Sequence, residues 1–273
     1  MVRLLAPLVE GGRAVPLSCY DIPGKPRDAA GSLLAVDKPF TQLSGRVTDR
    51  RTVASPARRL SGAASDNGGM VEQSIWMRQV TAEPGHSKWY IERFRARARA
   101  GDDLDGEARL VDAMVRRHSR VLDAGCGPGR VGGALAAAGH HVVGVDVDPV
   151  LVEAAEQDHP GPKWMVGDLA ELDLPAQGIA EPFDAIVCAG NVMTFLAPST
   201  RREVLTRFRA HLAVDGRAVI GFGADRGYEF GEFLADAAAA GLEPDLLLST
   251  WDLRPFTEDS TFVVAVLVRL PGI

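Results

Sequence analysis

The pattern of apolar and polar positions predicts alternating strands and helices over the second half of the chain. Short apolar, β-branched runs are separated there by longer segments of helical period, which is typical of a parallel sheet with helices on both faces. The predicted strands are one that ends at Leu122, then 141–145, 164–166, 183–189, 217–222, 244–251 and 261–269. The predicted helices are 131–140, a segment from Pro149, 198–212 and 228–240, with a turn at Asp215–Gly216 before the fifth strand.

Helices are also predicted over residues 70–118, ahead of the first strand. The segment 83–100 places Trp89, Tyr90 and Phe94 at helical spacing among several arginines, and a second helical pattern follows it. Aromatic residues at helical spacing usually belong to a core, so burial is the favoured interpretation for Trp89 and Phe94. The arginines are predicted to form a solvated face.

Residues 1 to 69 differ from the rest in pattern and charge. Gly, Ser, Pro and Arg recur without a sustained period, and ten Lys and Arg stand against six Asp and Glu, although the whole chain has a net charge of −6. Such a segment does not repay the entropy of ordering it, so we expect a disordered or spurious N-terminal extension, with the functional chain beginning at Met70. A basic arm for nucleic acid over Arg46–Arg59 is the alternative. No stacking pattern of aromatic residues interleaves its charges, so nucleic acid is not the expected partner.

The overall composition, with 46% hydrophobic and 24% charged residues in a chain of 273, is ordinary for a globular protein. The apolar run Leu4–Val9 is too short for a signal-peptide core, and no run is long enough to span a membrane. Cys19, Cys126 and Cys188 give neither a disulfide framework nor paired metal-ligand spacing. We therefore expect a cytoplasmic protein that has no metal site and does not enter a membrane.

The segment Val121–Arg130, with the sequence VLDAGCGPGR, predicts the end of a strand, a tight glycine turn and the start of a helix. Glycine permits positive φ and close approach to a ligand, and a helix N-terminus offers free N–H groups. Asp146 ends the second strand 21 residues after Gly125, a spacing at which an acid can accept hydrogen bonds from both hydroxyls of a ribose. The alternative is that Asp146 only caps the helix that starts at Pro149, a role for which Asp148 is the better candidate.

The end of the turn separates two classes of ligand. Dinucleotide enzymes carry a small residue at the position that Arg130 occupies here, which counts against a nicotinamide cofactor. An apolar pair, an acid and then G-x-G-x-G resembles, at every position, motif I of the class I S-adenosylmethionine-dependent methyltransferases. The resemblance extends over about Val121 to Arg269. It implies a Rossmann-like, doubly wound, mostly parallel seven-stranded α/β sheet with an antiparallel last strand over 119–273, and a helical N-terminal lid over 70–118.

The resemblance also implies a site for S-adenosyl-L-methionine. The glycine turn would wrap the methionine part, Asp146 would hold the ribose, and Asp168, in the segment WMVGDL, would read the adenine. The cofactor-binding residues expected in this way are Asp123, Gly125, Gly127, Gly129, Asp146, Val147, Asp168, Leu169, Ala189 and Asn191.

The acceptor side of the site is expected after the fourth strand. Gly190–Phe195 should face the transferable methyl group, and the sequence AGNVMTF lacks the Pro-Pro-aromatic pattern typical of enzymes that methylate exocyclic amino groups of nucleobases. Cys188 lies within the predicted strand, so a buried structural thiol is favoured over a nucleophile. In this family the helices ahead of the first strand commonly form part of the substrate pocket, which makes His86 and Tyr90 candidates for positioning or deprotonating an acceptor.

The function expected from these features is in-line methyl transfer to an acceptor, most simply a small molecule. Two alternatives remain open at this point. One is a cofactor-binding protein without catalytic activity, and the other, less favoured, is a nicotinamide-dependent oxidoreductase.

Overall fold

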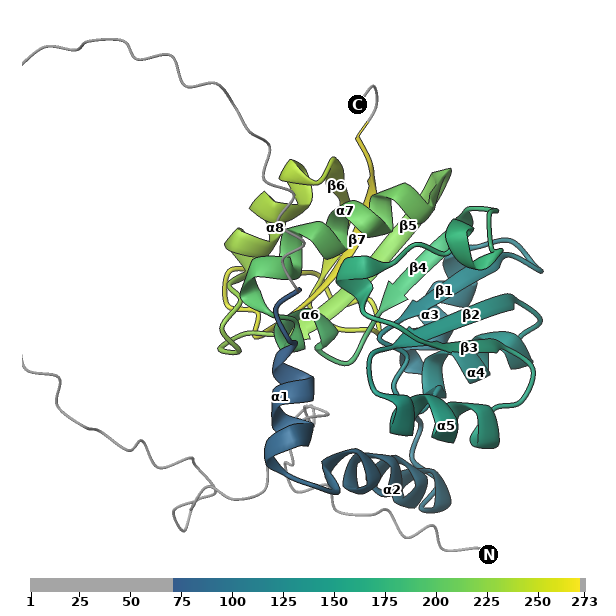
Figure 1. Ribbon diagram of the computed structural model, residues 1–273. Helices are drawn as coiled ribbons and strands as arrows, with labels where there is room; N and C mark the ends of the chain where they lie inside the picture. Colours follow the sequence, from purple (N-terminus) through teal and green to yellow (C-terminus); the bar gives the residue numbers. More distant parts are fainter. Residues whose placement is uncertain (1–70, 271–273) are drawn as a thin grey trace, which may run out of the picture. The chain divides into compact units, whose positions relative to one another are not determined.

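The computed structural model describes residues 71–270, in which a seven-stranded sheet carries helices on both faces (Figure 1). Residues 1–70 and 271–273 are not described. The predicted extension 1–69, including its basic segment and Cys19, therefore lies outside the described residues. Within the described part, no helix has the length and apolar character needed to cross a membrane.

The strands follow the order β3-β2-β1-β4-β5-β7-β6 across the sheet. The first five are parallel, and β7 lies between β5 and β6 and is antiparallel to both. This arrangement confirms the predicted Rossmann-like α/β fold with an antiparallel last strand. The order reverses between β1 and β4, which is where open α/β sheets bind ligands, beyond the carboxyl ends of the strands. The strands are β1 (Arg120–Ala124), β2 (His141–Asp146), β3 (Lys163–Val166), β4 (Phe183–Cys188), β5 (Leu212–Gly223), β6 (Leu242–Leu248) and β7 (Phe262–Arg269).

Helices cover both faces of the sheet, so adjacent residues of a strand enter different parts of the core. Val121 packs with α3 and α4, whereas its neighbour Leu122 packs with α7 and α8, and both are fully buried. A strand buried on both faces needs a continuous apolar run, which explains the pattern in the sequence. One face carries α3 (Gly106–Met114), α4 (Arg130–Ala137) and α5 (Pro149–Asp158), and the other carries α6 (Val192–Phe195), α7 (Arg201–His211) and α8 (Phe230–Ala239). Short 3-10 turns occupy η1 (Leu169–Glu171), η2 (Pro175–Gln177) and η3 (Pro198–Thr200).

Two further helices, α1 (Ile75–Ala82) and α2 (His86–Arg99), precede the sheet in the chain. Trp76 of α1 contacts Phe195 of α6, and its indole N–H donates to Asp148, which follows β2. Both partners lie just beyond the carboxyl ends of strands. The pair α1–α2 is therefore placed at the edge of the sheet where ligands bind in this fold (Figure 1).

Two details differ from the sequence-based expectations. The turn predicted at Asp215–Gly216 lies inside β5, where the pairing with β4 shifts register between Phe183 and Ala185. The extra residues of β5 are accommodated as an irregularity, so the strand begins earlier than its apolar run. The expected burial of Trp89 is also wrong, because this side chain is 40% exposed, whereas Phe94 is buried as predicted.

Candidate cofactor and acceptor site

The glycine turn after β1 is anchored to the end of β2. The backbone N–H groups of Gly125 and Cys126 donate to the carbonyl of Val145 at 2.8 and 3.1 Å. Gly125, Gly127 and Gly129 have φ angles of 77, 54 and 81°, the left-handed region that favours glycine. The turn ends at Gly129, directly before the first residue of α4.

Close packing explains why two of these three positions are glycine. A Cβ atom on Gly125 would lie 2.7 Å from Cγ1 of Val192, in α6. A Cβ atom on Gly129 would lie 2.8 Å from Cβ of Ala155 and 3.0 Å from the indole of Trp164. Close backbone approach to α5 and α6 therefore explains both positions without a ligand.

Gly127 differs from its neighbours because the space beside it is open. Among residues 71–270, a Cβ atom there would meet only Cε1 of Tyr90 within 4 Å, at an ordinary contact distance of 3.8 Å. The N–H of Gly127 donates to Oδ2 of Asp146 at 2.8 Å. The middle glycine of the turn is thus the one with space beside it, which Tyr90 of α2 borders, and its N–H is bonded to the acid at the end of β2.

The indole of Trp164 fills the space beneath the turn. The Trp164 ring would overlap a Cβ atom on Gly144 of β2, and a Cβ atom on Gly132 of α4 would lie 2.8 Å from it. Its N–H donates to the carbonyl of His159 at 2.9 Å. One large side chain from β3 thus supports the turn, β2 and α4 together.

Asp146 is buried at the carboxyl end of β2. Its Oδ2 accepts from the N–H of Gly127, and its Oδ1 accepts from the N–H of Asp148 at 3.0 Å. Burial is the main cause that raises the pKa of this carboxyl to about 6, and the charge of Asp148 adds to the effect, although the backbone donors oppose it. Each carboxylate oxygen has a second lone pair, so both can still accept from a ligand hydroxyl.

Asp123 supports the glycine turn from below. This residue of β1 is buried, and its Oδ2 accepts from the N–H of Gly132 in α4 at 2.8 Å. Burial raises its pKa to about 7, and the nearby carboxylate of Asp146 adds to the shift. The hydrogen bond fixes the first turn of α4 to the strand, so the contact that the structure gives Asp123 is a structural one.

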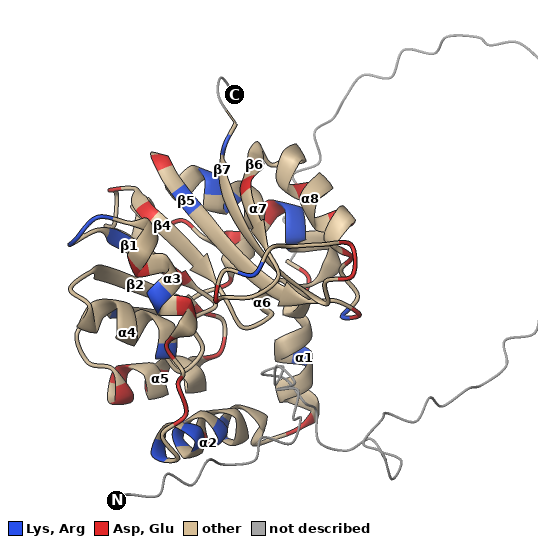
Figure 2. Cartoon of the chain, turned by 180° about the vertical axis from the view of Figure 1, so that it is seen from behind, with Lys and Arg blue, Asp and Glu red and all other residues tan. Residues whose placement is uncertain are grey.

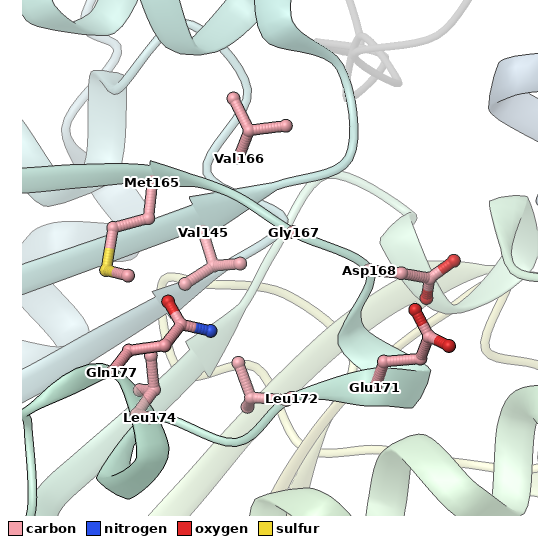
Figure 3. A pocket seen from close by; sticks show the side chains of 9 residues that line it. All are labelled: Val145, Met165, Val166, Gly167, Asp168, Glu171, Leu172, Leu174 and Gln177. Atoms are coloured by element: carbon pink, nitrogen blue, oxygen red, sulfur yellow. The ribbon is translucent and has the colours of Figure 1, made fainter.

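Asp168 follows β3 and lines a cavity of about 170 Å³ (Figure 3), whereas Leu169 is buried in the core. Asp168 caps η1 by accepting from the N–H of Ala170 at 2.9 Å. Glu171, the last residue of η1, lines the same cavity (Figure 3). Its remaining lining residues are Val145, Met165, Val166, Gly167, Leu172, Leu174 and Gln177.

Asn191 links the ends of β4 and β5. It has a φ of 63° and is buried, its Oδ1 accepts from the N–H of Gly223 at 2.7 Å, and its own N–H donates to the carbonyl of Gly221 at 3.3 Å. The side-chain oxygen is thus already bonded to the protein backbone. Ala189, directly after β4, and Cys188, within it, are both buried. Burial raises the pKa of Cys188 far above the neutral range, which keeps the thiol protonated and agrees with a structural role.

The two acceptor-side candidates occupy different surroundings in α2. The ring of Tyr90 lies edge-on to Trp76 and Phe94, with centroid distances of 5.3 and 5.0 Å, and beside the open side of the glycine turn. The Nδ1 atom of His86 lies 3.4 Å from a carboxylate oxygen of Glu83, and its ring packs edge-on to Trp76. The structure therefore brings Tyr90, rather than His86, to the glycine turn.

Several arginines lie along α2 (Figure 2), and the partly exposed side chains of Arg95 and Arg97 agree with the predicted solvated face. Both also form salt bridges, which were not predicted. Arg95 pairs with Asp158 at the end of α5, through Nε–Oδ2 and Nη2–Oδ1 distances of 2.8 and 2.9 Å. Arg97 pairs with Asp102 at 2.8 Å. These guanidinium groups are satisfied by neighbouring acids of the chain, which leaves them poorly suited to clamp a substrate carboxylate.

Sequence reasoning missed one part of the site. Asp148 was predicted only as the cap of α5, and it does accept from the N–H of Val150 at 2.9 Å. It also accepts from the indole of Trp76 and the hydroxyl of Ser87, on α1 and α2. The one signal in the sequence is that a buried tryptophan N–H requires an acceptor, but the partner is 72 residues away.

Comparisons of the sequence and of the fold with known proteins identify the same class of protein. Residues 121–216 match the family described as "Methyltransferase domain". A TehB-like SAM-dependent methyltransferase from Corynebacterium glutamicum is 50% identical, with a TM-score of 0.65, over 68% of this chain and 100% of that one. The Mg-protoporphyrin O-methyltransferase of Rhodobacter capsulatus is 34% identical over 149 residues, and a putative methyltransferase of Bacillus subtilis is 23% identical over 146. These two matches cover 51% and 52% of this chain but only 60% and 57% of the relatives' own lengths.

The glycine turn, the sheet topology and an identity of 50% over the whole length of a solved relative define one class. The chain belongs to the class I S-adenosylmethionine-dependent methyltransferases, and S-adenosylmethionine is its cofactor. The residues fit this molecule, because the acid at the end of β2 is bonded to the N–H of Gly127 and the space beside that glycine is not filled by a close contact. The resemblance found in the sequence is confirmed.

Proposed function

We propose that the protein transfers the methyl group of S-adenosylmethionine to a small-molecule acceptor. The observation that carries this proposal is the space beside Gly127, which the ring of Tyr90 borders, in a residue whose backbone N–H is bonded to the carboxylate of Asp146. An acid suited to ribose hydroxyls next to an unfilled glycine position is the arrangement that a nucleoside with an attached amino acid requires. The fold places it at the reversal of strand order.

In this proposal the glycine turn holds the methionine part, Asp146 accepts from the ribose hydroxyls, and Asp168 with Leu169 contacts the adenine. Val147 and Ala189 contribute from the ends of β2 and β4. Of the helices of 70–118, α1 and α2 act as a lid, which their contacts with Asp148 and α6 support, whereas α3 packs against the sheet. The hydrogen bonds of Asp123 and Asn191 to the backbone favour an indirect role, in which they fix the turn and the strand ends.

The sulfonium of the bound cofactor supplies an already activated methyl group. The chain then has to align the acceptor with that methyl and exclude water, which can lower a barrier by about 7–11 kcal/mol in ideal cases. Tyr90 is the better placed of the two candidates to position an acceptor atom, because it lies beside the turn. His86, whose ring packs edge-on to Trp76, then serves the packing of the lid.

The acceptor is best sought among small metabolites. The Rhodobacter capsulatus relative is named for magnesium protoporphyrin, so this compound belongs in the first panel of acceptors. A cytoplasmic location is part of the proposal and rests on the sequence. Fractionation of cells that express the tagged chain tests it, and recovery in the membrane pellet would contradict it.

Two measurements test the proposed function. Thermal shift with S-adenosylmethionine, S-adenosylhomocysteine, NAD and NADP should give stabilisation by the first two only, because a ligand that binds the native state raises its stability. A cell extract incubated with the protein and methyl-labelled cofactor should then yield a labelled small molecule, identified by mass. Binding without any transfer would leave a protein that only binds the cofactor, and stabilisation by NAD instead would favour an oxidoreductase.

A further inference from the structure

Asp148 joins three helices through one buried carboxylate. The residue is only 1% exposed and lies between β2 and α5. Its Oδ1 caps α5, whereas its Oδ2 accepts from the indole N–H of Trp76 at 2.9 Å and from the hydroxyl of Ser87 at 2.5 Å. These two donors belong to α1 and α2, so both helices of the proposed lid are bonded to a single oxygen atom.

The same residue is bonded to the proposed ribose acid. The N–H of Asp148 donates to Oδ1 of Asp146, whose other oxygen accepts from the N–H of Gly127. A chain of hydrogen bonds thus runs from the glycine turn through both acids to Trp76 and Ser87. A change in the position of the helices at Asp148 is transmitted to the carboxylate of Asp146 through a single backbone N–H group.

A second contact holds α2 to α5 at a distance from this chain of hydrogen bonds. Arg95 binds Asp158, the last residue of α5, with two hydrogen bonds. The first attachment is at the beginning of α5, beside the ribose acid, and the second is at its end. The two attachments provide a natural comparison, because they join the same pair of helices at opposite ends of α5.

We propose that Asp148 is a positioning residue that makes docking of α1 and α2 and binding of the cofactor at Asp146 mutually dependent. The inference rests on the proposed cofactor site. Docked helices supply the two donors that fix Asp148 and, through it, the orientation of Asp146. By thermodynamic reciprocity, a bound cofactor strengthens the docking by the same factor by which docking strengthens its binding.

The test compares two variants at this attachment with one at the other. Trp76→Phe and Ser87→Ala each remove a donor to Asp148, and Arg95→Gln breaks the remote ion pair. The dissociation constant of S-adenosylhomocysteine is measured by calorimetry, and amide exchange of α1 and α2 is followed with and without it. We expect weaker binding by about 5- to 150-fold in the first two variants, with reduced ligand-dependent protection of both helices. Arg95→Gln should bind as the wild type does.

A double-variant cycle shows whether the effect passes through Asp148. Ser87→Ala should weaken binding in the wild-type background and have little further effect in Asp148→Ala, which removes the oxygen that the hydroxyl contacts. Additive losses would overturn the proposal, as would binding in Ser87→Ala as tight as in Arg95→Gln. Ser87→Ala keeps the test decisive even if Trp76→Phe does not fold. A wild-type protein that binds neither S-adenosylmethionine nor S-adenosylhomocysteine would instead overturn the proposed function and the coupling together.

Discussion

Gly127→Ala should separate cofactor binding from folding. At a φ of 54°, alanine in the left-handed region destabilises the native state by about 1–2 kcal/mol. Alanine also lowers the entropy of the unfolded chain, which offsets about 0.4–1 kcal/mol of this loss. No packing cost adds to this, because the new methyl group would meet only Tyr90, at 3.8 Å. A net loss of about 1 kcal/mol lowers the melting temperature of a folded part of this size by about 2–4 °C.

The effect on the cofactor should be larger than the effect on folding. The methyl group would occupy the free side of the turn, and overpacking of that kind costs about 1–3 kcal/mol, which corresponds to about 5- to 150-fold in affinity. Calorimetric titration with S-adenosylhomocysteine and thermal melting of the same samples give both quantities.

Gly101→Ala provides the matched control. It lies at the end of α2 with a φ of 81°, and no atom of the described part of the chain lies within 4 Å of an added Cβ atom, so it carries the same backbone strain away from the turn. A similar loss of melting temperature with unchanged affinity is expected for it. Unchanged affinity in folded Gly127→Ala would refute the assignment of this glycine to the cofactor.

Three further predictions concern the two acids. Asp146→Ala should weaken the binding of S-adenosylhomocysteine by about 1.5–3 kcal/mol, the range for hydrogen bonds to a charged group. A dissociation constant that calorimetry finds unchanged would remove Asp146 from the site. Affinity should fall as the pH drops through about 6, where Asp146 gains a proton and loses acceptor capacity, so a flat titration series from pH 8 to 5 would contradict this. The pKa of Asp123 is raised to about 7 from an ordinary value of 3.8, so its contribution to stability is fully present below about 4 and is lost as the pH rises through about 7. The melting temperature of Asp123→Asn should therefore rise relative to that of the wild type as the pH increases from 5 to 8. A difference between the two melting temperatures that does not change with pH would rule this out.

The parts of the fold that follow from local pattern could be predicted from the sequence. β4 is buried on both faces from Ala185 to Cys188, so these residues form an uninterrupted apolar run. The start of α5 is marked by Asp148, which caps it, and by Pro149, whose ring suits the first helical position. The start of β5 could not be predicted, because its irregular pairing with β4 keeps Asp215–Gly216 within a strand. Trp89 has the spacing of a core residue, yet the guanidinium of Arg93 covers its ring at 5.7 Å instead.

In the site, too, features set by residues nearby in the sequence could be predicted, whereas features set by distant residues could not. The three glycines of the turn are evident in the sequence, but only packing against Val192 and Trp164 distinguishes the structural pair from Gly127. The contacts of Asp148 are invisible in the sequence, because its donors lie 61 and 72 residues away. His86 and Tyr90 are separated by one turn of helix, and the orientation of α2 determines which of them lies beside the glycine turn.

The position of Trp164 restricts which substitutions the residues around it can accept. Its indole occupies room left by Gly129, Gly132 and Gly144, which belong to the turn, to α4 and to β2. A larger residue at any of the three is excluded while the indole remains, and loss of the indole leaves a void that typically costs about 3–5 kcal/mol. Substitutions at these four positions are therefore coupled. Alanine at Gly144 becomes tolerable only in a chain in which a smaller side chain has already replaced the tryptophan.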